Sequence, residues 1–334
     1  MFESARGLLL RRQYAEAITE WERVLPLVRQ LGLREREATA LNRMASSFLS
    51  LRQSQSAAIY YKQALSIHLE LRDILSEVDT LGLLGEILTL DRVDEAIGVF
   101  EKALSLSREV KYRFGEGSAL MGLGACYARN SQFEKAIGNY EEALTIFQEA
   151  NLRDSEARAL NDLGASYQAL SQYAKAISYQ EQAAAIYSEG NKRAESLALR
   201  NIARSYGSLG LYEKAIEYQK MALKAARETK VPLDEFSPLM QLGLSHDYAK
   251  RYEEALSYYE QAQVIAGTVN NPLVEIAVLN GLALRANIAE THLLALITEQ
   301  GENGYQLEYP FIEEEWNPSG PGIFAWRGTP GGRA

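Results

Sequence analysis

Small residues recur along this chain every 39 or 40 residues, and this regularity limits what the chain can fold into. One column is alanine in all seven copies: Ala17, Ala57, Ala96, Ala136, Ala176, Ala215 and Ala255. A second column, seven residues further on, holds Val24, Ala64, Ala103, Ala143, Ala183, Ala222 and Ala262. A third column, upstream of the first, holds Ala45, Gly85, Gly124, Gly164, Ala203, Gly243 and Ala283. Self-similarity at a fixed period of this size predicts a solenoid.

Within each copy, apolar residues recur at helical spacing, and short polar turns such as 150–153 and 190–193 separate the helical stretches. Each copy therefore predicts helix, tight turn, helix, tight turn, which makes the chain an all-α α-solenoid of antiparallel helix pairs. Glycine in a helix interior costs about 1 kcal/mol relative to alanine. We therefore expect the glycines of the third column to mark positions where the two helices of a pair cross closely.

Composition excludes several classes of protein. No apolar run reaches the roughly 18 residues of a membrane span, and Glu3 precedes the short leucine run near the N-terminus, so a secretory signal is not predicted. The net charge of -9 argues against nucleic acid as a partner, because phosphates are neutralised by basic surfaces. The expected location is cytoplasmic. The single cysteine, Cys126, lies on a periodic helix and is expected to be a buried core residue rather than a reactive thiol.

Two patterns in the chain resemble the tetratricopeptide repeat (TPR) family. A first-helix pattern appears as Leu160, Leu163, Gly164 and Tyr167, and a second-helix pattern appears as Phe133, Ala136, Ile137, Tyr140, Ala143 and Leu144. The resemblance covers about residues 1–300. The repeat length is similar to that of the long-helix variants in kinesin light chains, Leu-Gly-Asn adaptors and cyanobacterial-type bacterial arrays. HEAT and armadillo repeats share the period, but the glycine and alanine columns favour the TPR family.

The resemblance implies a right-handed superhelix whose concave groove is lined by the first helices and receives a peptide or a partner helix. Asn42, Asn161 and Asn280 match the asparagines that bind a peptide backbone in related arrays. Four arginines at groove positions are expected to form a basic patch suited to an acidic segment: Arg129, Arg158, Arg200 and Arg204. The alternative is that neighbours such as Asp162 and Glu195 neutralise these arginines on a solvated face.

Two further patterns have both a binding and a structural interpretation. Tyr60, Tyr179, Tyr218 and Tyr258 share one second-helix column. They are either binding anchors or, as we favour, residues that pack against the next copy. The charged run at 34–38 is expected to be a solvated helix start.

Catalytic motifs are lacking in the sequence. His68, His246 and His292 occupy different repeat positions, and neither a glycine-rich phosphate loop nor an HExxH motif occurs. We therefore expect no enzymatic activity, no metal and no cofactor.

The C-terminal region departs from the repeat. We expect a TPR array over residues 1–300, with an incomplete first unit and a broken last one, followed by an irregular Gly/Pro-rich tail over 301–334. Segment 309–316, YPFIEEEW, combines aromatic residues with three glutamates. One hypothesis is that it folds back into the basic part of the groove; the alternative is a disordered tail or the end of a gene fragment.

These observations favour a non-enzymatic scaffold or adaptor that binds a protein or peptide, possibly an acidic one. The alternative is a regulatory or sensor arm of a larger bacterial signalling system, whose partner would be a caspase-like protease, a kinase or a nucleotide switch.

Overall fold

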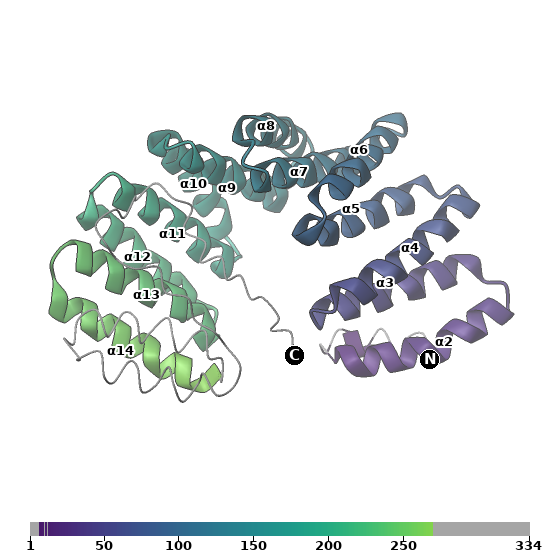
Figure 1. Ribbon diagram of the computed structural model, residues 1–334, viewed down its shortest axis with the longest axis horizontal. Helices are drawn as coiled ribbons and strands as arrows, with labels where there is room; N and C mark the ends of the chain where they lie inside the picture. Colours follow the sequence, from purple (N-terminus) through teal and green to yellow (C-terminus); the bar gives the residue numbers. More distant parts are fainter. Residues whose placement is uncertain (1–6, 10, 12, 270–334) are drawn as a thin grey trace, which may run out of the picture. The chain divides into compact units, whose positions relative to one another are not determined.

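The computed structural model describes residues 7–9, 11 and 13–269, and all regular structure in that part of the chain is helical (Figure 1). The helices are α2 (Tyr14–Gln30), α3 (Arg34–Ser50), α4 (Ser54–Leu71), α5 (Ile74–Asp91), α6 (Val93–Glu109), α7 (Arg113–Arg129), α8 (Phe133–Glu149), α9 (Arg153–Ala169), α10 (Tyr173–Ser188), α11 (Lys192–Ser208), α12 (Tyr212–Glu228), α13 (Pro232–Tyr248) and α14 (Tyr252–Val269).

Consecutive helices pack as antiparallel pairs. The first and second helices of one repeat lie together in α3 with α4, α5 with α6, α7 with α8, α11 with α12, and α13 with α14. Most of the connecting turns contain one residue in the left-handed region, which ends the helix before it. Gly32 and Gly210 take this role with φ of 66° and 72°, and glycine adopts it without steric strain. The predicted alternation of helix and tight turn is confirmed.

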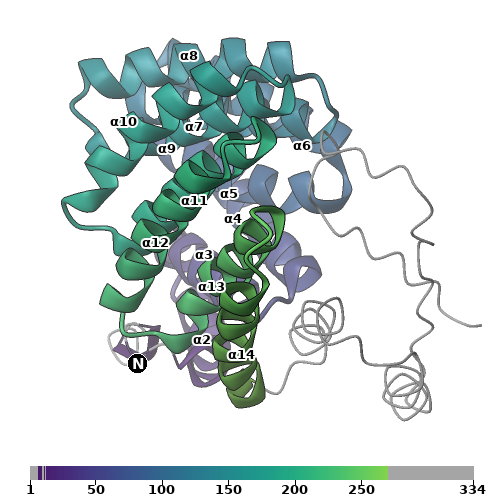
Figure 2. The same cartoon turned by 90° about the vertical axis from the view of Figure 1, so that its left-hand side faces the viewer.

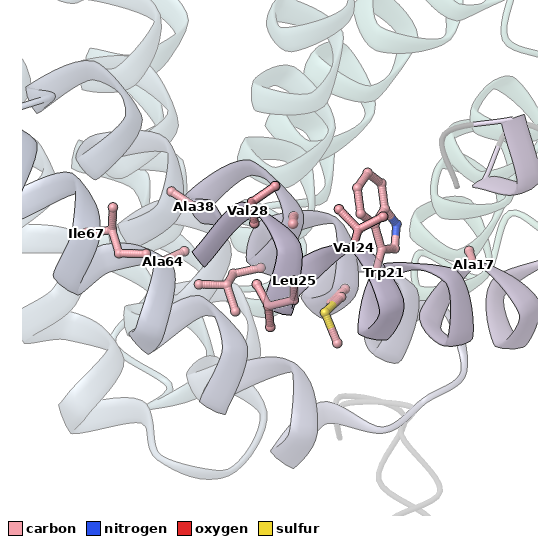
Figure 3. Packing of buried hydrophobic residues seen from close by; sticks show 11 residues of the cluster. Ala17, Trp21, Val24, Leu25, Val28, Ala38, Ala64 and Ile67 are labelled. Carbon is pink, nitrogen blue, oxygen red and sulfur yellow. The ribbon is translucent and has the colours of Figure 1, made fainter. Parts of the chain in front are cut away.

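The chain divides into two compact units, with the boundary between Ser166 and Tyr167 inside α9. In the first unit, Figure 3 shows Trp21, Val24, Leu25 and Val28 of α2 packed with alanines of α3 and α4. Trp21 is only 1% exposed, so this aromatic ring lies in the core of the first unit. Figure 2 shows the chain from the side of the second unit, in which α11 packs against α12 and α13 against α14.

Three glycines of the third column, Gly85, Gly124 and Gly243, lie at close helix crossings, as expected. A Cβ atom added to Gly85 would lie 2.6 Å from the Phe100 ring, and one added to Gly124 would lie 2.4 Å from the Tyr140 ring. At Gly243 the corresponding distance, to Tyr259, is 2.3 Å. Atoms cannot approach this closely, so each second-helix aromatic ring occupies the space that only glycine leaves open.

Candidate functional site: the first-helix surfaces

Asn42 contacts both neighbouring helices of the first unit. Its Nδ2 donates to the Thr80 hydroxyl on α5 at 3.2 Å and lies 3.4 Å from Nε2 of His68 on α4. The Asn42 side chain therefore links α3, α4 and α5. This geometry stabilises the contact between two successive repeats, and a role of Asn42 in partner binding stays a prediction.

The burial of His68 predicts that this junction is sensitive to pH. The side chain is buried, and burial lowers the pKa of His68 below its usual 6.5 against the attraction of Asp73 and Glu77. A histidine with a lowered pKa binds its proton more tightly in the unfolded chain, so its contribution to stability is complete above pH 6.5 and is lost as pH falls. We expect the urea midpoint to decrease as the pH is lowered from 7.5 to 5.5. The slope of the midpoint against pH should be smaller in a His68→Gln variant. An unchanged slope in that variant would contradict this assignment.

Arg129 and Arg158, both in the first unit, contact groups of their own chain. Arg129 donates from a guanidinium nitrogen to the Leu90 carbonyl oxygen, at the C-terminal end of α5, at 2.9 Å. Nη2 of Arg158 lies 4.0 Å from Oε1 of Glu86. Burial raises the pKa of Asp162, and Arg158 and Asn161 oppose that rise. Asn161 donates to Oδ1 of Asp162 at 3.2 Å. Arg158 therefore lies near the carboxylates of Glu86 and Asp162, and roles of Arg129, Arg158 and Asn161 in partner binding stay predictions.

Arg200 and Arg204 lie one turn apart on α11 in the second unit, and their surroundings differ. Within the described residues neither guanidinium forms an ion pair with a carboxylate; Glu195, the predicted neutraliser, pairs with Lys192 at 2.9 Å. Arg204 donates from Nε and Nη2 to Oε1 of Gln168, at 3.1 and 2.6 Å. The Nε atom of Arg200 is buried and has no hydrogen-bond partner there. Burial and, second, the charge of Arg204 lower the pKa of Arg200.

An apolar side chain flanks this arginine pair. Leu197 is on α11, three residues before Arg200 and seven before Arg204, so all three lie on one helical face. It is 45% exposed. This face of α11 therefore combines two cations, of which Arg204 is exposed and Arg200 half-buried, with an aliphatic contact. Asn280 and segment 309–316 lie outside the described residues.

The tyrosine column stacks on rings of its own repeat, and Tyr60 also packs, as expected, against a core cluster that contains Leu84 and Leu88 of the next copy. Tyr179 stacks on Tyr167 with ring centroids 5.5 Å apart. The same column gives three further ring pairs: Phe48 with Tyr60, Tyr206 with Tyr218, and His246 with Tyr258. In each pair one ring comes from the first helix and the other from the second. These ring pairs therefore join the first and second helices of the same repeat.

A column of glutamates, of which Glu37, Glu77 and Glu116 are buried and the other three half-buried, was missed in the sequence. It comprises Glu37, Glu77, Glu116, Glu156, Glu195 and Glu235, again at spacings of 39 or 40 residues. Glu116, only 8% exposed, accepts from Arg108 at 3.0 Å and from Arg113 at 2.9 Å. Arg108 comes from the last turn of the preceding second helix, so the column joins successive repeats. The repeated spacing of these glutamates was the signal in the sequence that could have revealed the column.

The charged run at 34–38 contains one of these glutamates, which corrects its interpretation as a solvated helix start. Glu37 is 4% exposed and accepts from Arg29 and Arg34. Burial opposes ionisation of Glu37, but the two arginines outweigh it and lower the pKa of Glu37. Glu37 is therefore a buried, ionised partner at the first repeat junction.

Other reactive side chains are separate from one another. Cys126 is fully buried beside the Thr89 hydroxyl, and burial raises the pKa of its thiol, as expected for a core residue. Across residues 13–269 no three His, Cys, Asp or Glu side chains converge as a metal site would require. Of the helices described, none is long and apolar enough to cross a bilayer.

Comparisons with known proteins agree with this architecture. A family model of the tetratricopeptide repeat matches residues 76–149, 155–228 and 194–267. A search of curated proteins found no sequence match.

Several solved structures are similar in fold. Aspartyl phosphate phosphatase F from Bacillus subtilis is 21% identical with a TM-score of 0.61, over 79% of this chain and 68% of that chain. A signal transduction ATPase (STAND) protein with a tetratricopeptide repeat sensor, from Pyrococcus horikoshii, is 19% identical with a TM-score of 0.59, over 89% of this chain and 43% of that chain. TPR-like repeats assigned to a kinesin light chain from Podosopora anserina are 19% identical with a TM-score of 0.51, over 59% of this chain and 98% of that chain. At these identities the likeness concerns the fold alone.

Proposed function

Because this chain belongs to the tetratricopeptide repeat family, we propose that it is a non-enzymatic scaffold that binds an acidic segment of a partner protein on the exposed face of α11. TPR arrays are typical protein-interaction modules, and this supports the general role. The binding surface within the second unit is defined by Leu197, Arg200 and Arg204.

The observation that carries this proposal is the contrast between two sets of arginines. At the repeat junctions, Arg34, Arg108 and Arg113 each contact two carboxylates of the chain. Arg200 and Arg204 contact none among the described residues. Two adjacent cations without an internal counter-ion repel each other. An external carboxylate would relieve that repulsion through charge-assisted hydrogen bonds.

The experiment uses a synthetic peptide of residues 309–316 as the acidic probe and measures its affinity for the chain. The Arg200→Ala/Arg204→Ala double variant should weaken binding at least tenfold, about 1.4 kcal/mol, because both cations contribute to recognition. A probe with glutamines in place of its three glutamates should bind similarly weakly.

The matched control is Lys220→Ala/Lys224→Ala, which removes two basic residues at the same spacing on α12. We expect this variant to keep the affinity of the parent chain. Charge reversal at Arg200 and Arg204 that leaves probe binding intact would contradict the proposal. Binding of this peptide would also show that segment 309–316 has the affinity needed to compete with an external partner.

A sensor arm in a larger signalling system is the second candidate, and the similarity to the STAND protein favours it. That protein carries its tetratricopeptide repeats as a sensor, and this chain spans 43% of its length. The two functions are compatible, since a sensor arm also binds its signal through such a surface. A natural longer chain that joins this array to a nucleotide-switch, kinase or protease domain would favour the sensor role, and a change in that domain's activity on adding the acidic probe would test it.

A further inference from the structure

We propose that Arg200, Arg204 and Gln168 form a recognition site for a phosphorylated side chain of the partner protein. This inference deepens the proposed function and rests on it, because it specifies which anionic group the face of α11 accepts. The site combines two guanidinium groups with a buried amide donor, and it contains no carboxylate among the described residues.

Hydrogen-bond donors outnumber acceptors in this cluster. The Gln168 carbonyl oxygen already accepts two bonds from Arg204, and Oδ1 of Asn201 accepts a third from Nη2 at 3.3 Å. The Nε2 group of Gln168 and the Nε group of Arg200 are both buried without a partner in the described part of the chain. A buried donor that lacks an acceptor destabilises a protein. A group rich in acceptor oxygens placed beside these side chains would supply the acceptors that the cluster lacks.

The charge of the cluster also fits a phosphate better than a carboxylate. Arginine stays protonated in proteins, so Arg200 and Arg204 together supply two positive charges. A phosphorylated serine, threonine or tyrosine carries a charge of about -1.5 to -2 at pH 7 and three acceptor oxygens. A carboxylate carries one charge and two oxygens. A phosphate therefore balances both the charge and the donor excess, and its geometry suits bidentate contacts with guanidinium groups.

The site is open to a polypeptide. Arg204 is exposed on the surface, and its hydrogen bonds to Gln168 and Asn201 hold the guanidinium in one orientation before a ligand arrives. Such preorganisation lowers the entropy lost on binding. Leu197 supplies an aliphatic contact on the same helical face for the residue next to the phosphate. These features favour a phosphorylated protein segment as the ligand.

The test compares three small probes on the full chain: N-acetyl-phosphoserine amide, N-acetyl-glutamate amide and N-acetyl-serine amide. Nitrogen-15 NMR of the arginine Nε–H groups follows binding directly. We expect phosphoserine to shift the Arg200 and Arg204 signals in a saturable way, with an affinity about tenfold or more above that of glutamate. Serine should cause no saturable shift. Lowering the pH from 7.5 to 5 should weaken phosphoserine binding, because the second phosphate pKa is about 6.

Variants separate charge from geometry. Arg204→Lys keeps the charge but removes the planar fork, so phosphoserine binding should weaken while glutamate binding changes little. Lys220→Ala/Lys224→Ala should leave the phosphoserine shifts unchanged. Equal affinity for phosphoserine and glutamate would overturn the phosphate site and leave the acidic-segment function standing. No saturable shift with phosphoserine would also overturn it, and a lack of binding by the 309–316 peptide would separately contradict the proposed function.

Discussion

Replacing Gly124 by leucine should lower the free energy of unfolding of the first unit by about 3 kcal/mol or more, because overpacking a close helix crossing forces side chains and backbone apart. The Tyr140 ring would lie 2.4 Å from a Cβ at this position, before any further leucine atom is placed. Tyr140 is only 3% exposed, so its ring is enclosed by the core. Urea unfolding followed by circular dichroism measures the effect.

Gly138 on α8 provides the matched control. A Cβ added there meets nothing within 4 Å, so the substitution Gly138→Ala only improves helix propensity. We expect Gly138→Ala to raise the free energy of unfolding by about 0.5–1 kcal/mol, and Gly124→Ala to lower it. Opposite signs of the change in unfolding free energy for the same Gly→Ala substitution would distinguish an effect of packing from one of helix propensity. If both alanine variants stabilised the chain, the close crossing at Gly124 would be wrong.

Removing the Glu116 carboxylate should weaken the junction between α6 and α7. Glu116→Ala leaves Arg108 and Arg113 without their buried acceptor and removes two charge-assisted hydrogen bonds. Both arginines are nearly half exposed and regain water contacts, which limits the loss to about 2 kcal/mol. The readout is the urea midpoint, together with hydrogen exchange of the α7 amides, which should become faster at the start of that helix.

Glu142 is the control for this prediction, because it contacts the same Arg108 from the surface. Its side chain is 50% exposed, against 11% for Glu116. Exposed ion pairs contribute about 0–1 kcal/mol, so Glu142→Ala should have a small effect. Equal losses for the two variants would show that burial of Glu116 is not what stabilises the junction.

Most of the fold could be predicted from the sequence because repetition amplifies weak local signals. One alanine says little, whereas an alanine at the same place in seven copies indicates a steric requirement. The crossing glycines show this directly, since the rings that fill the space beside them come from the same repeat. The buried glutamates had the same spacing, but their charge made a solvated surface the natural interpretation. Their burial became evident only with the positions of Arg29, Arg34, Arg108 and Arg113.

The candidate site was less predictable. Asn42, Arg129, Arg158 and Arg200 all stood at groove positions, and nothing in their spacing separated them. In the structure Asn42 bonds Thr80, Arg129 bonds the Leu90 carbonyl, and Arg158 lies near Glu86. The partners of Asn42 and Arg129 lie on a neighbouring repeat, 38 and 39 residues away along the sequence, and Glu86 lies two repeats before Arg158, 72 residues away.

By itself, then, the sequence determined the helix pairs, the turns between them and the small residues at each crossing, because contacts within one repeat are local and recur in every copy. Tertiary structure decided which polar side chains bond to other groups of the chain and which remain available to a partner. That choice depends on the distances between groups on different repeats, and these distances are set when the helices pack. Among the groove arginines of the second unit, it left Arg200 and Arg204 without an internal counter-ion in the described chain.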